Sequence, residues 1–169
     1  PGFKPDHAEV DFTSIYEPDK LQDVDIESFR ALLWDLPCCT TNSAGTAQGQ
    51  PIESLLVARG RDLLQALLRA GWEETSYERS AEYLSAADYF FGRPPDAIFK
   101  KGRSKGTERN ELGIWLTPIQ VDGVPVWAAQ VKHAIGRRTE IEETFLGVRL
   151  DPDIKDGRNY MMQLTCYSV

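Results

Sequence analysis

The sequence predicts a single α+β domain in which a mainly antiparallel sheet packs against two or more helices. Three observations support this prediction. Two alternating apolar segments flank the dipeptide Asp122-Gly123, which is typical of a hairpin turn. Leucines recur at helical spacing between residues 63 and 70. The chain has 169 residues, of which 41% are hydrophobic, and this is enough for one sizeable core, so two domains are not needed.

The N-terminal segment is rich in acidic residues and has few apolar residues before Ile26. We therefore predict an extended acidic arm over residues 1–24, followed by the single domain over residues 25–169. Asp25 suits the N-cap of a short helix that ends before Pro37. The apolar positions of this helix lie at helical spacing and are Ile26, Phe29, Leu32 and Leu33.

A polar stretch is followed by a strand and a helix. Residues 40–50 are small, polar and glycine-bearing, which favours a mobile loop. Residues 54–58 form a short apolar run that indicates a strand. We expect the next helix to end at Gly71. Its apolar stripe comprises Leu63, Leu64, Leu67, Leu68 and Ala70.

The second half of the chain carries the clearest strand patterns. Residues 96–100 indicate a strand, and residues 101–110 a charged loop that contains two glycines. Residues 112–117 and 126–132 are the two alternating strands of the hairpin. We read the positive charges near the loop as a solvated surface. These residues are Lys100, Lys101, Arg103, Lys105 and Arg109.

Trp115 and Trp127 lie at alternating positions in the hairpin, and we expect them to pack in the core. Residues 144–150 indicate a further strand. After it, Asp151 suits the N-cap of a C-terminal helix with Pro152 at its first position.

Composition excludes several partners. The net charge of −7 repels nucleic acid at long range, so we predict no nucleic-acid partner. No apolar run reaches the length of a membrane-spanning helix. Because the chain begins at Pro1 instead of Met, a membrane-anchored context in a longer protein stays open.

The three cysteines do not form the even, spaced pattern of a disulfide-stapled domain. We expect buried free thiols. A bridge from Cys38 or from Cys39 to Cys166 is the alternative. We do not expect the adjacent cysteines to pair with each other, because disulfide geometry opposes it.

Known catalytic and cofactor motifs are absent. The chain has neither the glycine-rich phosphate loops of nucleotide-binding proteins nor a G-x-S-x-G nucleophile elbow. Its two histidines, His7 and His133, are far apart, and the spacing of Asp151, Asp153 and Asp156 does not fit a calcium loop. We predict no metal and no cofactor.

Six short segments together resemble the C-terminal domain of the LssY family over residues 51–164. In chain order they are P-I-E-S-L-L-V-A-R-G from Pro51, A-G-W from Ala70, F-G-R-P-P-D from Phe91, R-N-E-L-G-I-W from Arg109, P-V-W from Pro125 and D-P-D-I-K-D-G-R from Asp151. The resemblance has departures: Glu111 and Gly113 stand where the family pattern carries His and Arg, and Val148-Arg149 stands where it carries a His pair.

The resemblance implies no established activity, and the sequence alone does not determine the function. The retained scaffold with replaced histidines favours a non-catalytic binding or accessory domain of a bacterial, envelope-associated protein, with an envelope or periplasmic location favoured over a cytoplasmic one. Its ligand would be a small molecule or a protein. The oligomeric state stays open, and self-assembly through strand 112–116 is one alternative.

The alternative function is a hydrolase that acts on a phosphate-containing or lipid-like substrate. Its candidate catalytic residues are Asp96, His133, Asp151 and Asp153. The candidate ligand-binding residues of the domain are Arg93, Arg109, Trp115 and Arg158. Arg93 and Asp96 also suit a structural ion pair. A hydrolase requires these side chains to converge on one pocket.

Overall fold

A long antiparallel hairpin is the centre of the computed structural model, which describes residues 14–75, 88–102, 109–137 and 148–150. Its strands are β7 (Arg109–Val121) and β8 (Val124–Arg137). Asp122 and Gly123 connect them with φ angles of 49° and 73°, the left-handed conformations that a two-residue hairpin turn requires. The predicted hairpin is confirmed.

Five further strands complete the main sheet, which has the order β4-β8-β7-β6-β5. Strand β9 pairs with β8, and β1 pairs with β7 in parallel, whereas the other pairs are antiparallel. The remaining strands of this sheet are β1 (Gln22–Val24), β4 (Ser54–Val57), β5 (Glu73–Glu74), β6 (Ala97–Gly102) and β9 (Val148–Leu150). The chain is thus a sheet-dominated α+β domain.

The described residues contain two α-helices at the predicted places, α1 (Ile26–Leu32) and α2 (Gly60–Arg69). The Asp25 carboxylate accepts a hydrogen bond of 2.7 Å from the Ser28 backbone N–H, which confirms the predicted cap. Gly71 follows α2 with a φ of +81°, the left-handed conformation that ends many helices. No helix within the described ranges is long and apolar enough to cross a membrane.

The prediction of a mobile loop over residues 40–50 was wrong. This stretch forms a hairpin instead, in which β2 (Cys39–Thr41) and β3 (Gln48–Pro51) make a second, two-stranded sheet and residues 42–47 connect them. The Asn42 side-chain oxygen accepts hydrogen bonds from the backbone N–H groups of Thr46 and Ala47, at 2.8 and 3.2 Å. The polar residues that suggested a loop therefore build a tight turn.

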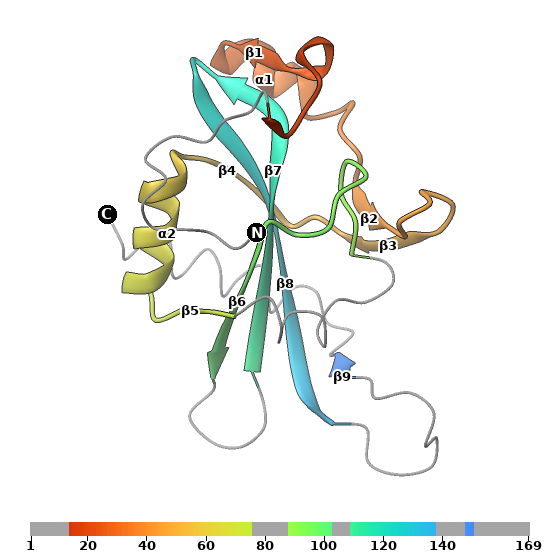
Figure 1. The fold of residues 1–169 in the computed structure, drawn as a ribbon, viewed down its shortest axis with the longest axis vertical. Coiled ribbons are helices and arrows are strands. Elements are labelled where there is room, and N and C mark those ends of the chain that lie inside the picture. Colours follow the sequence, from red (N-terminus) through yellow and green to blue (C-terminus); the bar gives the residue numbers. More distant parts are fainter. Residues whose placement is uncertain (1–13, 76–87, 103–108, 138–147, 151–169) are drawn as a thin grey trace.

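The two faces of the β7–β8 hairpin carry different neighbours. Helix α2 packs on one face, where its leucines meet Trp127 and the even-numbered apolar residues of β7. The β2–β3 hairpin lies on the opposite side of β7 and β8 (Figure 1). Trp115 packs there against Phe90 and Ala128. Both tryptophans are only 2% exposed, as predicted for core residues.

Part of the predicted N-terminal arm belongs to the sheet. Strand β1 extends one edge of β7, with Gln22 paired to Ile119, and the side chain of Tyr16 is buried. Residues 1–13 lie outside the described residues. So do residues 144–147 of the predicted last strand and the whole predicted C-terminal helix.

Candidate functional site

A shallow pocket opens on the face of the sheet opposite to α2, and its volume of about 20 Å³ is room for little more than one water molecule. Three neighbouring strands supply its floor, because Gly113 of β7 pairs with Ile98 of β6 and with Gln130 of β8. We call it the acidic pocket. Its lining residues are Asp88, Pro95, Ile98, Glu111, Gly113, Trp115, Gln130 and Lys132.

The two acidic residues of the acidic pocket, Asp88 and Glu111, are buried, and Lys132 is half-buried. Glu111 and Lys132 occupy opposite positions on β7 and β8, and Lys132 Nζ forms an ion pair with Asp88, whose side chain is 7% exposed. The described lining thus holds two carboxylates and one ammonium group. Lys132 Nζ and the Asp88 carboxylate neutralise each other at this site.

Two buried polar atoms of the pocket lining have no hydrogen-bond partner among the described residues: the indole nitrogen Nε1 of Trp115 and the side-chain oxygen Oε1 of Gln130. The amide nitrogen of Gln130 is fixed, since it donates to the carbonyl oxygens of Gln50 and Pro51 at 3.1 and 2.8 Å. The lining residues thus include one buried N–H donor and one buried carbonyl acceptor that the described residues leave without a partner.

Arg93 and Asp96, two of the predicted site residues, complete the sheet at a gap along β7. One Asp96 oxygen pairs with Arg93 Nη2 at 2.5 Å, and the other accepts a hydrogen bond of 2.7 Å from the Leu116 backbone N–H. The Tyr16 hydroxyl donates to the Leu116 carbonyl oxygen at 2.5 Å. Leu116 lies between the residues of β7 that pair with β6 and those that pair with β1. The side chains of Asp96 and Tyr16 therefore supply the hydrogen-bond partners that a neighbouring strand would give the Leu116 backbone.

Burial decides the direction of the pKa shift for two of the three groups in this network, Asp96 and Tyr16. It raises the pKa of Asp96 although the Leu116 N–H and Arg93 act against it. Burial also raises the pKa of the Tyr16 hydroxyl, against the effect of Arg93. For Arg93, burial acts to lower the pKa, but the Asp96 charge and the Tyr16 hydroxyl outweigh it, and the pKa is raised. The predicted structural ion pair is present, and its partners are engaged with each other.

His133, another predicted site residue, lies far from Asp96. Its Nδ1 donates to the side-chain oxygen of Asn110 at 2.7 Å, on the α2 face of the sheet. Asp96 contacts Leu116, which lies six residues further along β7, or about 20 Å at the rise of a strand. The structure therefore does not bring His133 and Asp96 together.

Of the other predicted site residues, only Trp115 has a described side chain, and it lines the acidic pocket. Arg109 begins β7, but its side chain is outside the described part of the structure. Asp151, Asp153 and Arg158 lie outside the described residues. Within the described ranges, no group of three or more His, Cys, Asp or Glu residues is arranged to hold a metal ion.

Sequence reasoning did not select most of the pocket residues. The alternation that places Trp115 on one face of β7 also places Glu111 and Gly113 there, and the same period applies to Gln130 and Lys132 on β8. These polar residues at alternating positions of otherwise apolar strands could have been used to predict a polar site on this face of the sheet. Asp88 had no such signal, because its contact with Lys132 joins distant parts of the chain.

The cysteine prediction was wrong: Cys38 and Cys39 form a disulfide with each other, and Cys38 is exposed instead of buried. Their Cα atoms are 3.8 Å apart, the spacing of neighbours across a trans peptide. Both cysteines lie at the start of β2, where the chain enters the small sheet. Cys166 lies outside the described residues.

Fold and site define a sheet-dominated α+β domain with a small pocket, lined by charged and apolar residues, on the sheet face away from its longer helix. A family model described as LssY C-terminus matches residues 33–168, which is most of the chain. The chain therefore belongs to this family, and the resemblance inferred from the sequence is confirmed. No curated protein and no solved structure matches the chain.

Proposed function

We propose that this chain is a non-catalytic binding or accessory domain of an envelope-associated protein, and that it binds a small polar ligand in the acidic pocket. The observation that carries the proposal is the pair of buried, unpartnered atoms Trp115 Nε1 and Gln130 Oε1 in one pocket lining. A buried polar atom without a partner costs about 1–3 kcal/mol. A ligand with one acceptor and one donor would supply both missing partners.

The charges of the pocket narrow the ligand class. Lys132, the cation among the described lining residues, is already paired with Asp88, which disfavours a phosphate or carboxylate. A neutral amide or hydroxyl compound, or a small cation, fits better. The volume of about 20 Å³ admits only one small functional group, which belongs to a small molecule or to one side chain of a larger partner.

The alternative of a phosphate- or lipid-directed hydrolase receives less support from the described residues. It requires Asp96 and His133 at one centre, but they lie about 20 Å apart along the sheet by the rise of a strand. Arg93, proposed to hold the anion, pairs with Asp96. Asp151, Asp153 and Arg158 lie outside the described residues, so the hydrolase stays a prediction for them.

The indole N–H signals of the tryptophans test the proposal by NMR. Titration with acetamide, ethanolamine and inorganic phosphate is followed at the Trp115 indole, which a Trp115→Phe variant assigns. We expect acetamide or ethanolamine to shift it and phosphate to leave it unchanged. The Trp127 indole, which donates to the Ala58 carbonyl on the other face at 2.9 Å, is the internal control.

Three results would contradict the proposal. A selective shift of the Trp115 signal by phosphate would overturn the ligand class. Equal shifts of the Trp115 and Trp127 signals would show that the probes do not select the pocket. Turnover of p-nitrophenyl phosphate or p-nitrophenyl acetate by the purified chain would favour the hydrolase.

A further inference from the structure

We propose that Cys38 and Cys39 form a reversible redox-modification site that exchanges with low-molecular-weight thiols such as glutathione. The disulfide joins residues that are adjacent in the sequence. A disulfide stabilises a fold mainly by closing a long loop in the unfolded chain, and the stabilisation grows with loop length. A bond between neighbours closes almost no loop. The position of this disulfide therefore indicates chemistry more than stabilisation.

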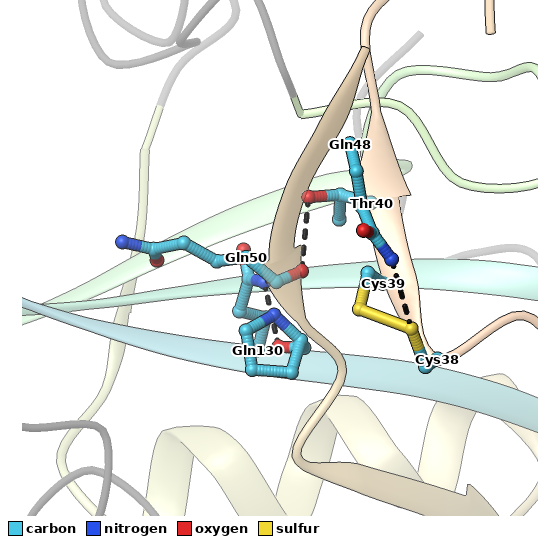
Figure 2. Close-up of a disulfide and its surroundings, with 7 residues drawn as sticks. Cys38, Cys39, Thr40, Gln48, Gln50 and Gln130 are labelled. Carbon is cyan, nitrogen blue, oxygen red and sulfur yellow. Dashed lines mark hydrogen bonds between the residues drawn. A yellow bond between two sulfur atoms is a disulfide. The ribbon is translucent and has the colours of Figure 1, made fainter. Parts of the chain in front are cut away.

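The two sulfur atoms differ in their surroundings. Cys38 is exposed, whereas Cys39 is half-buried, so an incoming thiolate has access to Cys38 Sγ. The side-chain amide Nε2 of Gln48 donates a hydrogen bond of 3.1 Å to Cys38 Sγ, as Figure 2 shows. A donor at this sulfur stabilises the negative charge that develops on it when it becomes a thiolate.

The complete exchange reaction consumes two small thiols of the glutathione class. The first thiolate attacks Cys38 Sγ, which breaks the bond to Cys39, leaves a mixed disulfide on Cys38, and releases a Cys39 thiolate that takes up a proton. A second thiolate attacks the outer sulfur of the mixed disulfide and releases the Cys38 thiolate, which is protonated in turn. The protein disulfide is reduced to two thiols, and the two small thiols are oxidised to one disulfide.

The surrounding fold does not depend on the sulfur bond. The Thr40 hydroxyl donates to the Gln50 carbonyl oxygen at 3.2 Å (Figure 2). Gln130 Nε2 donates to the Pro51 carbonyl oxygen at 2.8 Å. The Thr41 N–H donates to the Tyr89 carbonyl oxygen at 2.7 Å. These contacts hold β2 and β3 in place when the disulfide opens, so the reduced pair stays positioned to close again.

Thiol counting by mass spectrometry tests this site. The full chain carrying Cys166→Ser is incubated with excess reduced glutathione, and then with glutathione disulfide, without denaturant. Free thiols are blocked with N-ethylmaleimide at each stage. We expect both cysteines to be alkylated after reduction and neither after reoxidation, with an unchanged far-ultraviolet circular dichroism spectrum throughout.

A matched variant separates exchange at a pair from modification of any exposed thiol. With Cys39→Ser added, Cys38 has no neighbouring thiol, and we expect glutathione to stay attached to it after oxidation. The intact pair should release glutathione by closing its own disulfide. The proposal fails if the pair is alkylated only after unfolding in urea, if it retains glutathione as the single-cysteine variant does, or if the Cys166→Ser change alone prevents oxidation.

Discussion

The indole ring of Trp115 lies against the backbone of Gly113, two residues earlier on the same face of β7. A β-carbon at position 113 would be 2.8 Å from Cη2 of this ring and 3.2 Å from Cζ3. Real β-carbons do not approach a neighbour so closely. Gly113 thus provides the space in which the indole ring lies beside the acidic pocket.

We therefore expect Gly113→Ala to lower the free energy of unfolding by about 1–3 kcal/mol, the usual effect of forcing one extra carbon into a packed site. Urea unfolding followed by circular dichroism measures it. Gly102→Ala in β6 is the matched control, since a β-carbon there would meet nothing within 4 Å. Equal losses in both variants would show that the indole contact is not the cause.

The hydroxyl of Tyr16 supports the second prediction. Tyr16→Phe leaves the buried Leu116 carbonyl oxygen without this donor, and we expect a loss of about 1–3 kcal/mol in the free energy of unfolding. Thermal or urea unfolding measures this loss. Tyr89→Phe is the control, because the described residues offer its hydroxyl no hydrogen bond. A loss no larger than that of the control would refute the role assigned to Tyr16.

The raised pKa of Asp96 predicts a dependence of stability on pH. The folded chain holds the Asp96 proton more tightly than the unfolded chain, whose pKa is near 3.8. The resulting stabilisation is fully present below that pH and is lost as the pH rises through the higher folded pKa. In Asp96→Asn the side chain at position 96 does not titrate, so this variant does not lose that stabilisation as the pH rises.

Unfolding free energies of the wild type and of Asp96→Asn, measured from below pH 3.8 to neutrality, test this dependence. The wild-type value minus the variant value should fall as the pH rises and become constant above the folded pKa. The subtraction cancels the pH dependence that the other carboxylates contribute, because they titrate in both proteins. A difference that rises with pH would mean that the Arg93 ion pair outweighs burial.

Removal of residues 1–32, close to where the family match begins, provides a fourth prediction. Strand β1 and Tyr16 cover an edge of β7, so their loss exposes unpaired backbone groups from Leu116 to Val121. We expect the truncated chain to self-associate, because an open strand edge pairs with other chains. Light scattering at several concentrations measures this, with a chain that begins at residue 14 as the control. A monomeric truncated chain would disprove the prediction.

The elements that the sequence predicted correctly are specified by local chemistry. Asp25 caps α1, Gly71 ends α2, and Asp122-Gly123 turns the hairpin, and each acts within a few residues of itself. Alternation then places Trp115 and Trp127 on the sheet. These features can be predicted from neighbouring residues, without knowing which distant segments of the chain are in contact.

The missed features depend on contacts between distant segments. The acidic N-terminal composition suggested an arm, but it gives no sign that Tyr16 reaches Leu116. The polar composition of residues 40–50 concealed a hairpin that Gln130 holds from β8. Asp96 and His133 looked like partners by residue type, yet their strand positions separate them.

The parallel pairing of β1 with β7 also has a consequence for the order in which the chain folds. The β7–β8 hairpin joins neighbouring segments and can form early, because little loop entropy opposes it. Gln22 can pair with Ile119 only after all of the intervening chain has been synthesised. During translation β1 therefore stays without its partner strand until β7 has emerged from the ribosome, and its pairing cannot guide the folding of the segments between them.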